Sequence, residues 1–229
     1  MSIDAAEARW PKLLSLAVHE FRTPITVVAG YIRMVLKERA GPISDPQRKL
    51  LEEAEKSCGR LSALVTEMSD LSALEGGTAA FNAATVDLER VLTEAVESIP
   101  PLPDREVNLI MDGAVPAQLS GDATRLRSAL AALIVALRRE VVRSDRLILR
   151  RVSGDFEGGA VSRLAIGEPE AIDAIASADP AGLDRFDEWR GGSGLSLAIA
   201  RRVIERHGGK VYAPPGGTNA GALIVLPRL

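Results

Sequence analysis

The chain has 229 residues, a formal net charge of −3 and only one cysteine, Cys58. Its length allows one large domain or two small ones, and the mild charge gives no indication of nucleic acid or an anionic membrane as a partner. A lone cysteine cannot form an internal disulfide, which fits a reducing compartment. Since no apolar run is long enough to span a bilayer, we expect a cytoplasmic protein that is not embedded in a membrane.

The first predicted element is a long amphipathic helix from about Asp4 to Ala40, which Gly41 and Pro42 end. Its apolar stripe is expected to face a core and comprises Trp10, Leu14, Ala17, Phe21, Ile25, Val28, Ile32 and Val35. His19 falls off this stripe, so its imidazole is expected to be exposed. Pro24 lies inside the helix, where proline removes a hydrogen bond at a cost of about 3 kcal/mol, and we expect a bend there.

The seven residues from His19 to Ile25 read His-Glu-Phe-Arg-Thr-Pro-Ile. This run resembles the H-box of two-component histidine kinases, written H-E-[LF]-R-T-P-[LI]. The resemblance implies that His19 is the phospho-acceptor, that Glu20 orients its ring or accepts its proton, and that Thr23 places water for dephosphorylation. Arg22 and Pro24 complete the motif. A neutral imidazole beside a carboxylate is also a good nucleophile on chemical grounds alone. The alternative is a solvated surface histidine on a core helix.

A second helix is predicted after Ser44 or Asp45, which can cap it, with Pro46 in its first turn. It ends at Gly76-Gly77 and repeats a heptad through Leu50, Ala54, Ser57, Leu61, Leu64, Met68 and Leu71. Residues 1–76 are therefore predicted to form an antiparallel hairpin of two helices. Two helices alone cannot cover the apolar stripe that they carry. We expect a homodimer that closes a four-helix bundle. The alternative is that the stripe packs on the C-terminal half of the same chain.

A linker at residues 77–84 precedes a different pattern. Strands are predicted at 84–88, 106–111, 146–152, 160–166, 210–213 and 222–226, with a turn at 153–159. Helices are predicted at 89–98, from the capping residue Asp122 to Glu140, and at 194–207, with a loop or weak helix before the last one. This mixture predicts an α/β sandwich over residues 85–229, in which helices cover one face of a mixed sheet.

Three segments of this half resemble the ATP-binding domain of the same kinases, which has the Bergerat (GHKL ATPase-like) fold. Residues 191–199 resemble the G2 box, residues 183–186 the F-box, and residues 122–127 the lead-in to the N-box. The predicted fold class is thus α+β: a two-helix hairpin that forms a dimeric four-helix bundle, followed by a Bergerat-type α/β sandwich.

The departures from the family pattern lie where a nucleotide would bind. Ala132 and Ala136 occupy the N-box places where the family has asparagines that hold magnesium and phosphate oxygens. The stretch from Gly167 to Ala171 reads Gly-Glu-Pro-Glu-Ala and keeps neither the aspartate nor the glycines of the G1 box, D-x-G-x-G. Alanine offers Mg²⁺ no ligand, so we expect ATP and Mg²⁺ to be bound weakly or not at all. Gly191, Gly192 and Gly194 would then be vestigial, although a glycine-rich helix start can cradle an anion.

We therefore interpret the chain as a histidine phosphotransfer protein of a phosphorelay, whose His19 exchanges a phosphoryl group with the aspartate of a response-regulator receiver domain. Thr26, Val27 and Gly30 would complete the receiver-binding surface. The alternatives are an active sensor-type histidine kinase with an atypical nucleotide site and a non-catalytic pseudokinase that only binds partners. His207 is interpreted as a cation at a helix C-terminus. The basic run Arg138, Arg139, Arg143, Arg146, Arg150 and Arg151 is interpreted as a solvated face, with docking to an acidic partner as the alternative.

Overall fold

The computed structural model describes residues 10–113, 117–189, 194–217 and 220–229. The chain divides into two compact units, residues 1–79 and residues 80–229. Each unit has its own set of elements and is described by itself.

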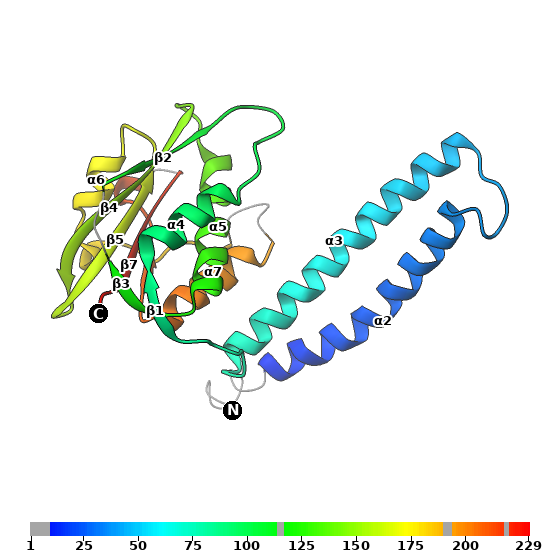
Figure 1. The fold of residues 1–229 in the computed structure, drawn as a ribbon, viewed down its shortest axis with the longest axis horizontal. Coiled ribbons are helices and arrows are strands. Elements are labelled where there is room, and N and C mark those ends of the chain that lie inside the picture. Colours follow the sequence, from blue (N-terminus) through cyan, green and yellow to red (C-terminus); the bar gives the residue numbers. More distant parts are fainter. Residues whose placement is uncertain (1–9, 114–116, 190–193, 218–219) are drawn as a thin grey trace. The chain divides into compact units, whose positions relative to one another are not determined.

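The first unit is a hairpin of two long helices, α2 (Trp10–Leu36) and α3 (Asp45–Glu75) (Figure 1). Ser44 caps α3 through a capping box, in which its hydroxyl accepts from the Gln47 N–H while the Gln47 side chain accepts from the Ser44 N–H. The Ser72 hydroxyl donates to the Pro11 carbonyl at 2.7 Å and joins the open end of the hairpin. Residues 4–9 of the predicted first helix lie outside the described residues, and residues 37–40 form a turn.

The seam between the two helices differs from the predicted stripes. The buried apolar residues are Leu14, Val18 and Ala29 on α2 and Cys58, Val65 and Leu71 on α3. By contrast, the predicted core positions Trp10, Phe21 and Val28 on α2 and Leu50, Leu61 and Leu64 on α3 are exposed. Both helices therefore carry a second, exposed apolar face beside the seam. The predicted stripes combined residues of this exposed face with residues of the seam.

The second unit is built on a five-stranded mixed sheet with the order β2-β4-β5-β7-β6. Strands β2 and β4 are parallel and all other neighbours are antiparallel. The strands are β2 (Asn108–Asp112), β4 (Arg146–Phe156), β5 (Gly159–Gly167), β6 (Lys210–Tyr212) and β7 (Gly221–Pro227). A separate ribbon pairs β1 (Ala84–Asp87) with β3 (Gln118–Gly121), and the sequence pattern did not predict β3.

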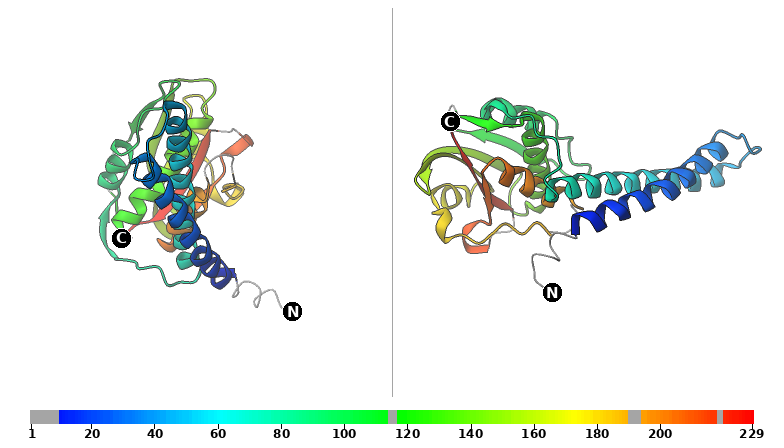
Figure 2. Two further views of the ribbon diagram at one scale, coloured as in Figure 1. Left: turned by 90° about the vertical axis from the view of Figure 1, so that its right-hand side faces the viewer. Right: turned by 90° about the horizontal axis from the view of Figure 1, so that it is seen from below.

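Three helices lie on one side of this sheet and a short one lies on the other (Figures 1 and 2). The three are α4 (Leu88–Glu97), α5 (Ala123–Glu140) and α7 (Ser196–Arg206), with α5 packed between α4 and α7. The short helix α6 (Ile172–Ser177) packs on β4, β5 and β7, where Ile172 and Ile175 join a buried cluster with Ala165 and Val225. The expectation of helices on one face only is therefore wrong, because α6 formed where the sequence indicated a loop or weak helix. Short 3₁₀ turns at Pro180–Gly182 and Pro215–Gly217 complete the unit.

Candidate functional site

His19 lies in the first half of α2 with its side chain exposed. Successive residues of an α-helix are rotated by about 100°, so His19, Thr23, Thr26 and Gly30 share one face of α2. The first three of these residues are exposed, and Gly30 has open space where a Cβ would lie. Arg22 flanks this face, and its carbonyl accepts a 2.8 Å hydrogen bond from the Thr26 hydroxyl. An incoming group can therefore reach the imidazole over a surface of small side chains.

The remaining predicted residues of this region are placed differently. Glu20 and Val27 are exposed but lie about 80–100° around the helix from His19, because adjacent positions do not face each other. Helix α2 runs through Pro24 without interruption. Proline has no N–H, so the Glu20 carbonyl loses its usual partner four residues on.

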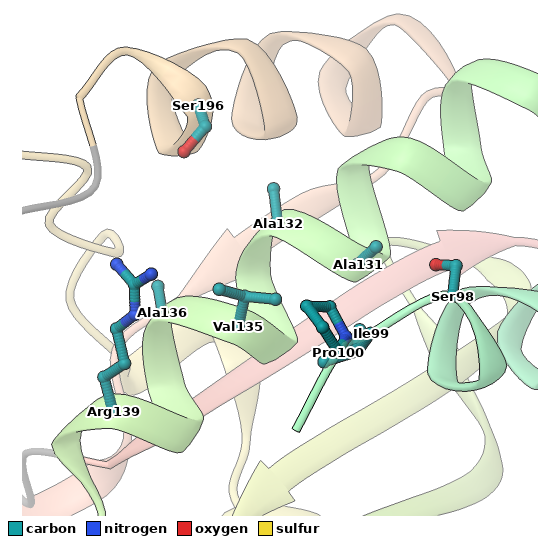
Figure 3. Close-up of a pocket in the computed structure, with 9 residues that line it drawn as sticks. All are labelled: Ser98, Ile99, Pro100, Ala131, Ala132, Val135, Ala136, Arg139 and Ser196. Carbon is teal, nitrogen blue, oxygen red and sulfur yellow. The ribbon is translucent and has the colours of Figure 1, made fainter. Parts of the chain in front are cut away.

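The predicted nucleotide positions line a cavity of about 340 Å³ beside α5 (Figure 3). Its described lining comprises Ser98, Ile99, Pro100, Ala131, Ala132, Val135, Ala136, Arg139 and Ser196. Ala132 and Ala136 present only methyl groups to it. None of these lining residues carries a carboxylate or a carboxamide, the oxygen ligands that Mg²⁺ prefers. The described chain also holds no group of three or more His, Cys, Asp or Glu side chains that could bind a metal. The described lining therefore does not fit a magnesium–nucleotide complex.

The stretch at the G1-box position is used for packing and loop structure. A Cβ on Gly167 would lie 2.6 Å from the Ile175 Cδ1, so this glycine lets α6 approach the sheet. The Glu168 carboxylate accepts hydrogen bonds from the backbone N–H groups of Arg143 (2.9 Å) and Ser144 (3.1 Å). The Ala171 N–H donates to the Glu168 carbonyl at the start of α6. Glu168 is thus engaged outside the cavity lining, and it does not replace the missing aspartate.

The segment before α7 is described in part. Gly191 and Gly192 lie outside the described residues, whereas Gly194 is exposed and has a φ of 58°, which favours glycine. Within the F-box segment, Phe186 is buried and its N–H donates to the Val211 carbonyl. Glu188 is also buried and pairs with Arg201 of α7. Residues in and next to the F-box segment therefore contribute to the packing of this unit.

His207 caps the C-terminus of α7, as predicted, but it is a buried hydrogen-bonding residue, so its interpretation as a cation there is wrong. Its Nε2 accepts from the Asp122 N–H at 2.9 Å, and its Nδ1 lies 2.7 Å from the Val203 carbonyl. Only a neutral ring protonated on Nδ1 satisfies both contacts. Burial disfavours the charged form of Asp122, but backbone N–H donors at Arg125 and Asn82 outweigh it and hold the pKa of this carboxyl below its usual 3.8. His207 and Asp122 together tie the end of α7 to the start of α5.

The arginine run is not a uniform solvated face. Arg138 and Arg151 are buried, and Arg151 pairs with Glu89. Arg139 lines the cavity, a position that the sequence analysis missed. Arg139 follows Ala136 by three residues and Ala132 by seven, so it lies on the same helix face. This spacing could have identified Arg139 as a lining residue.

Comparisons with known proteins agree with this architecture. Residues 12–77 match the family model of the His Kinase A (phospho-acceptor) domain. The chain is 29% identical over 213 residues to the circadian input-output histidine kinase CikA of Synechococcus elongatus, an alignment that covers 90% of this chain and 28% of that relative. It is 28% identical to the sensor-like histidine kinase SenX3 of Mycobacterium tuberculosis, with 92% and 52% covered. The chain thus spans from about a quarter to half of the length of these relatives.

Solved structures support the same fold at lower identity. Full-length ShkA in complex with AMPPNP superposes with a TM-score of 0.65 and 23% identity, covering 96% of this chain and 46% of that chain. The histidine kinase AdeS of Acinetobacter baumannii gives 0.53 and 18%, covering 92% and 98%. The predicted α+β arrangement of a helical hairpin followed by a mixed α/β domain is confirmed. No described helix combines the length with the apolar character that crossing a bilayer requires.

Proposed function

Because the chain belongs to the two-component histidine kinase family, we propose that it is a histidine phosphotransfer protein of a phosphorelay. His19 exchanges a phosphoryl group with the aspartate of a response-regulator receiver domain. The observation that carries this proposal is a contrast between the two units. The imidazole is exposed on α2, whereas the described lining of the cavity beside α5 has none of the carboxylate or carboxamide oxygens that Mg²⁺ prefers.

The transfer at His19 is a displacement at phosphorus. The lone pair of a neutral ring nitrogen attacks the aspartyl phosphate, the P–O bond to the aspartate breaks, and a P–N bond forms while the carboxylate leaves. The other ring nitrogen then gives its proton to solvent or to Glu20. Arg22 flanks the same face and supplies positive charge near the phosphoryl oxygens. Thr23, one turn after His19, is placed to hold a water for hydrolysis, so the same face also supports a phosphatase reaction.

The same proposal includes a homodimer. Beside the seam of the hairpin, large apolar side chains are exposed on both helices: Leu13, Leu16, Phe21, Tyr31, Leu50, Leu61 and Leu64. Several large exposed apolar side chains on one hairpin are typical of an interaction surface. A second hairpin would cover it by closing a four-helix bundle. The receiver would then bind the polar face of α2 around His19, with Thr26 and Gly30 as contacts and Val27 at its margin.

The second candidate is an active kinase, which the naming of the relatives as histidine kinases favours. It requires that metal and phosphate ligands come from residues other than Ala132 and Ala136. The third candidate is a pseudokinase that binds partners without transferring phosphate, and the intact His19-Glu20 pair speaks against it.

Two incubations separate the three candidates. A phosphorylated receiver domain is mixed with the wild-type chain and with His19→Ala, and radiolabel on the chain is measured. We expect label on the wild type only, and no label on either would refute the phosphotransfer proposal in favour of the pseudokinase. Radiolabelled ATP with Mg²⁺ is expected to leave the wild type unlabelled. Stable label at His19 from ATP would establish the kinase instead.

A further inference from the structure

The cavity beside α5 keeps the form of a binding site although its lining does not fit a magnesium–nucleotide complex. Its volume of about 340 Å³ lies within the range of small-molecule sites, roughly 300–1,000 Å³. Most of the lining is apolar: Ile99, Pro100, Ala131, Ala132, Val135 and Ala136. The polar groups are the hydroxyls of Ser98 and Ser196 and the guanidinium of Arg139. A mainly apolar lining with a few polar groups is the usual composition of such a site.

Arg139 supplies the only formal charge among the described lining residues. Figure 3 shows its side chain extending from α5 beside Ala136 at the edge of the cavity. Its side chain has no ion pair or hydrogen bond with the described chain. Helix α7 begins at Ser196 on the same side, so the positive end of its dipole also faces the cavity.

A second guanidinium group, that of Arg138, is buried next to Arg139 on α5. Arg138 is 5% exposed, its Nη2 donates to the Pro100 carbonyl at 2.7 Å, and its buried Nε has no partner. Burial and the neighbouring charge of Arg139 lower the pKa of Arg138. Arg105 adds a third cation, which donates to the carbonyls of Arg138, Arg139 and Val141. Three guanidinium groups therefore gather at this end of α5, beside the cavity.

We propose that this cavity binds a small organic anion without a metal. The ligand has a compact apolar body, which the alanine methyls and Val135 contact, and one carboxylate, sulfonate or phosphate group, which Arg139 holds. The guanidinium charges favour the anionic group, and none of the described lining residues is acidic. This inference goes beyond phosphotransfer at His19 and does not depend on it.

The test uses two probes that differ in a single charge. Anilinonaphthalene sulfonate has an aromatic body with one sulfonate, and phenylnaphthylamine has a similar body without it. Each is titrated into the full chain carrying isotope-labelled alanine methyl groups, with the Ala132 and Ala136 resonances assigned from glycine variants. These resonances report the cavity itself and not the apolar face of the hairpin. We expect the sulfonate to shift both resonances and to bind at least about tenfold more tightly than the neutral probe, as one charge-assisted hydrogen bond allows.

Two variants and a control complete the experiment. Arg139→Gln is expected to weaken the sulfonate about tenfold and to leave the neutral probe unchanged. Ala132→Leu fills the cavity and is expected to weaken both probes. Arg143→Gln removes an exposed charge that does not line the cavity and is expected to change neither. The proposal is overturned if the sulfonate leaves the two resonances unshifted, if both probes bind equally, or if Arg139→Gln has no more effect than Arg143→Gln.

Discussion

Replacing His207 by leucine tests whether this ring is the neutral hydrogen-bond acceptor that joins α5 to α7. Leucine fills similar space but leaves the Asp122 N–H, in a residue that is 6% exposed, without its acceptor. An unsatisfied buried donor costs about 1–3 kcal/mol. The edge-on contact with Phe81, at 4.8 Å between ring centroids, is worth about 0.5–1.5 kcal/mol more. The Val203 carbonyl keeps a partner, because it also accepts from the His207 backbone N–H. We therefore expect a loss of about 1.5–4.5 kcal/mol in the C-terminal unit.

The matched variant is His207→Gln, whose amide oxygen can accept the same hydrogen bond and should recover part of the loss. Because the two units can unfold separately, denaturant unfolding is followed by hydrogen exchange at amides of the central sheet and at Asp122. Equal stability of the leucine variant and the wild type, within about 0.5 kcal/mol, would refute the reasoning. His207 is the only histidine besides His19, so the glutamine variant should also keep any phosphohistidine label.

Three further changes probe the neighbouring packing, the Asp122 carboxyl and the proposed dimer. Gly121→Ala places a Cβ against the His207 ring and should cost about 1–3 kcal/mol in the same unfolding assay, with the cost relieved when His207 is also alanine. The pKa of Asp122 is lower in the folded chain than in the unfolded one, so its contribution to stability is complete above its usual value of 3.8 and is lost as the pH falls through the folded value. Asp122→Ala should cost about 0.5–2 kcal/mol at neutral pH and flatten the acid limb of a stability–pH curve. Leu61→Glu, on the exposed apolar face, should shift sedimentation from dimer to monomer, whereas an unchanged dimer would place the interface elsewhere.

Much of the architecture could be predicted because residues that commonly cap helices stand at the starts of several helices. Ser44 with Gln47 forms a capping box, and Asp122 caps α5, as its position before an apolar periodic run indicates. The core face of α5 was also recoverable, since Leu126, Leu130, Leu133 and Leu137 recur at helical spacing and all are fully buried.

The rest depended on contacts that periodicity does not encode. Helix α2 has two adjoining apolar faces, and the sequence cannot say which of them packs on α3. Strand β3 has only four residues and alternates between exposed and buried positions, too short a pattern to distinguish from a loop. Strands β4 and β5 run further than predicted because the chain reverses at Glu157 and Gly158, both with positive φ, and Gly154 and Asp155 remain in the ladder. The buried arginines were missed because their partners are backbone carbonyls and distant acids.

Helix α5 carries the residues that build the core and the residues that line the cavity on different sides. The four leucines that build the core lie on one side of this helix, and Ala132, Val135 and Arg139 lie roughly opposite, toward the cavity. Changes on the cavity side therefore leave the core contacts intact. Alanine is also the best helix former, about 0.7 kcal/mol better than asparagine per position, so Ala132 and Ala136 favour the helix while their methyl groups offer no metal ligand. Side chains that line the cavity can thus differ without disturbing the leucine contacts, which is why the fold alone does not decide what the cavity binds.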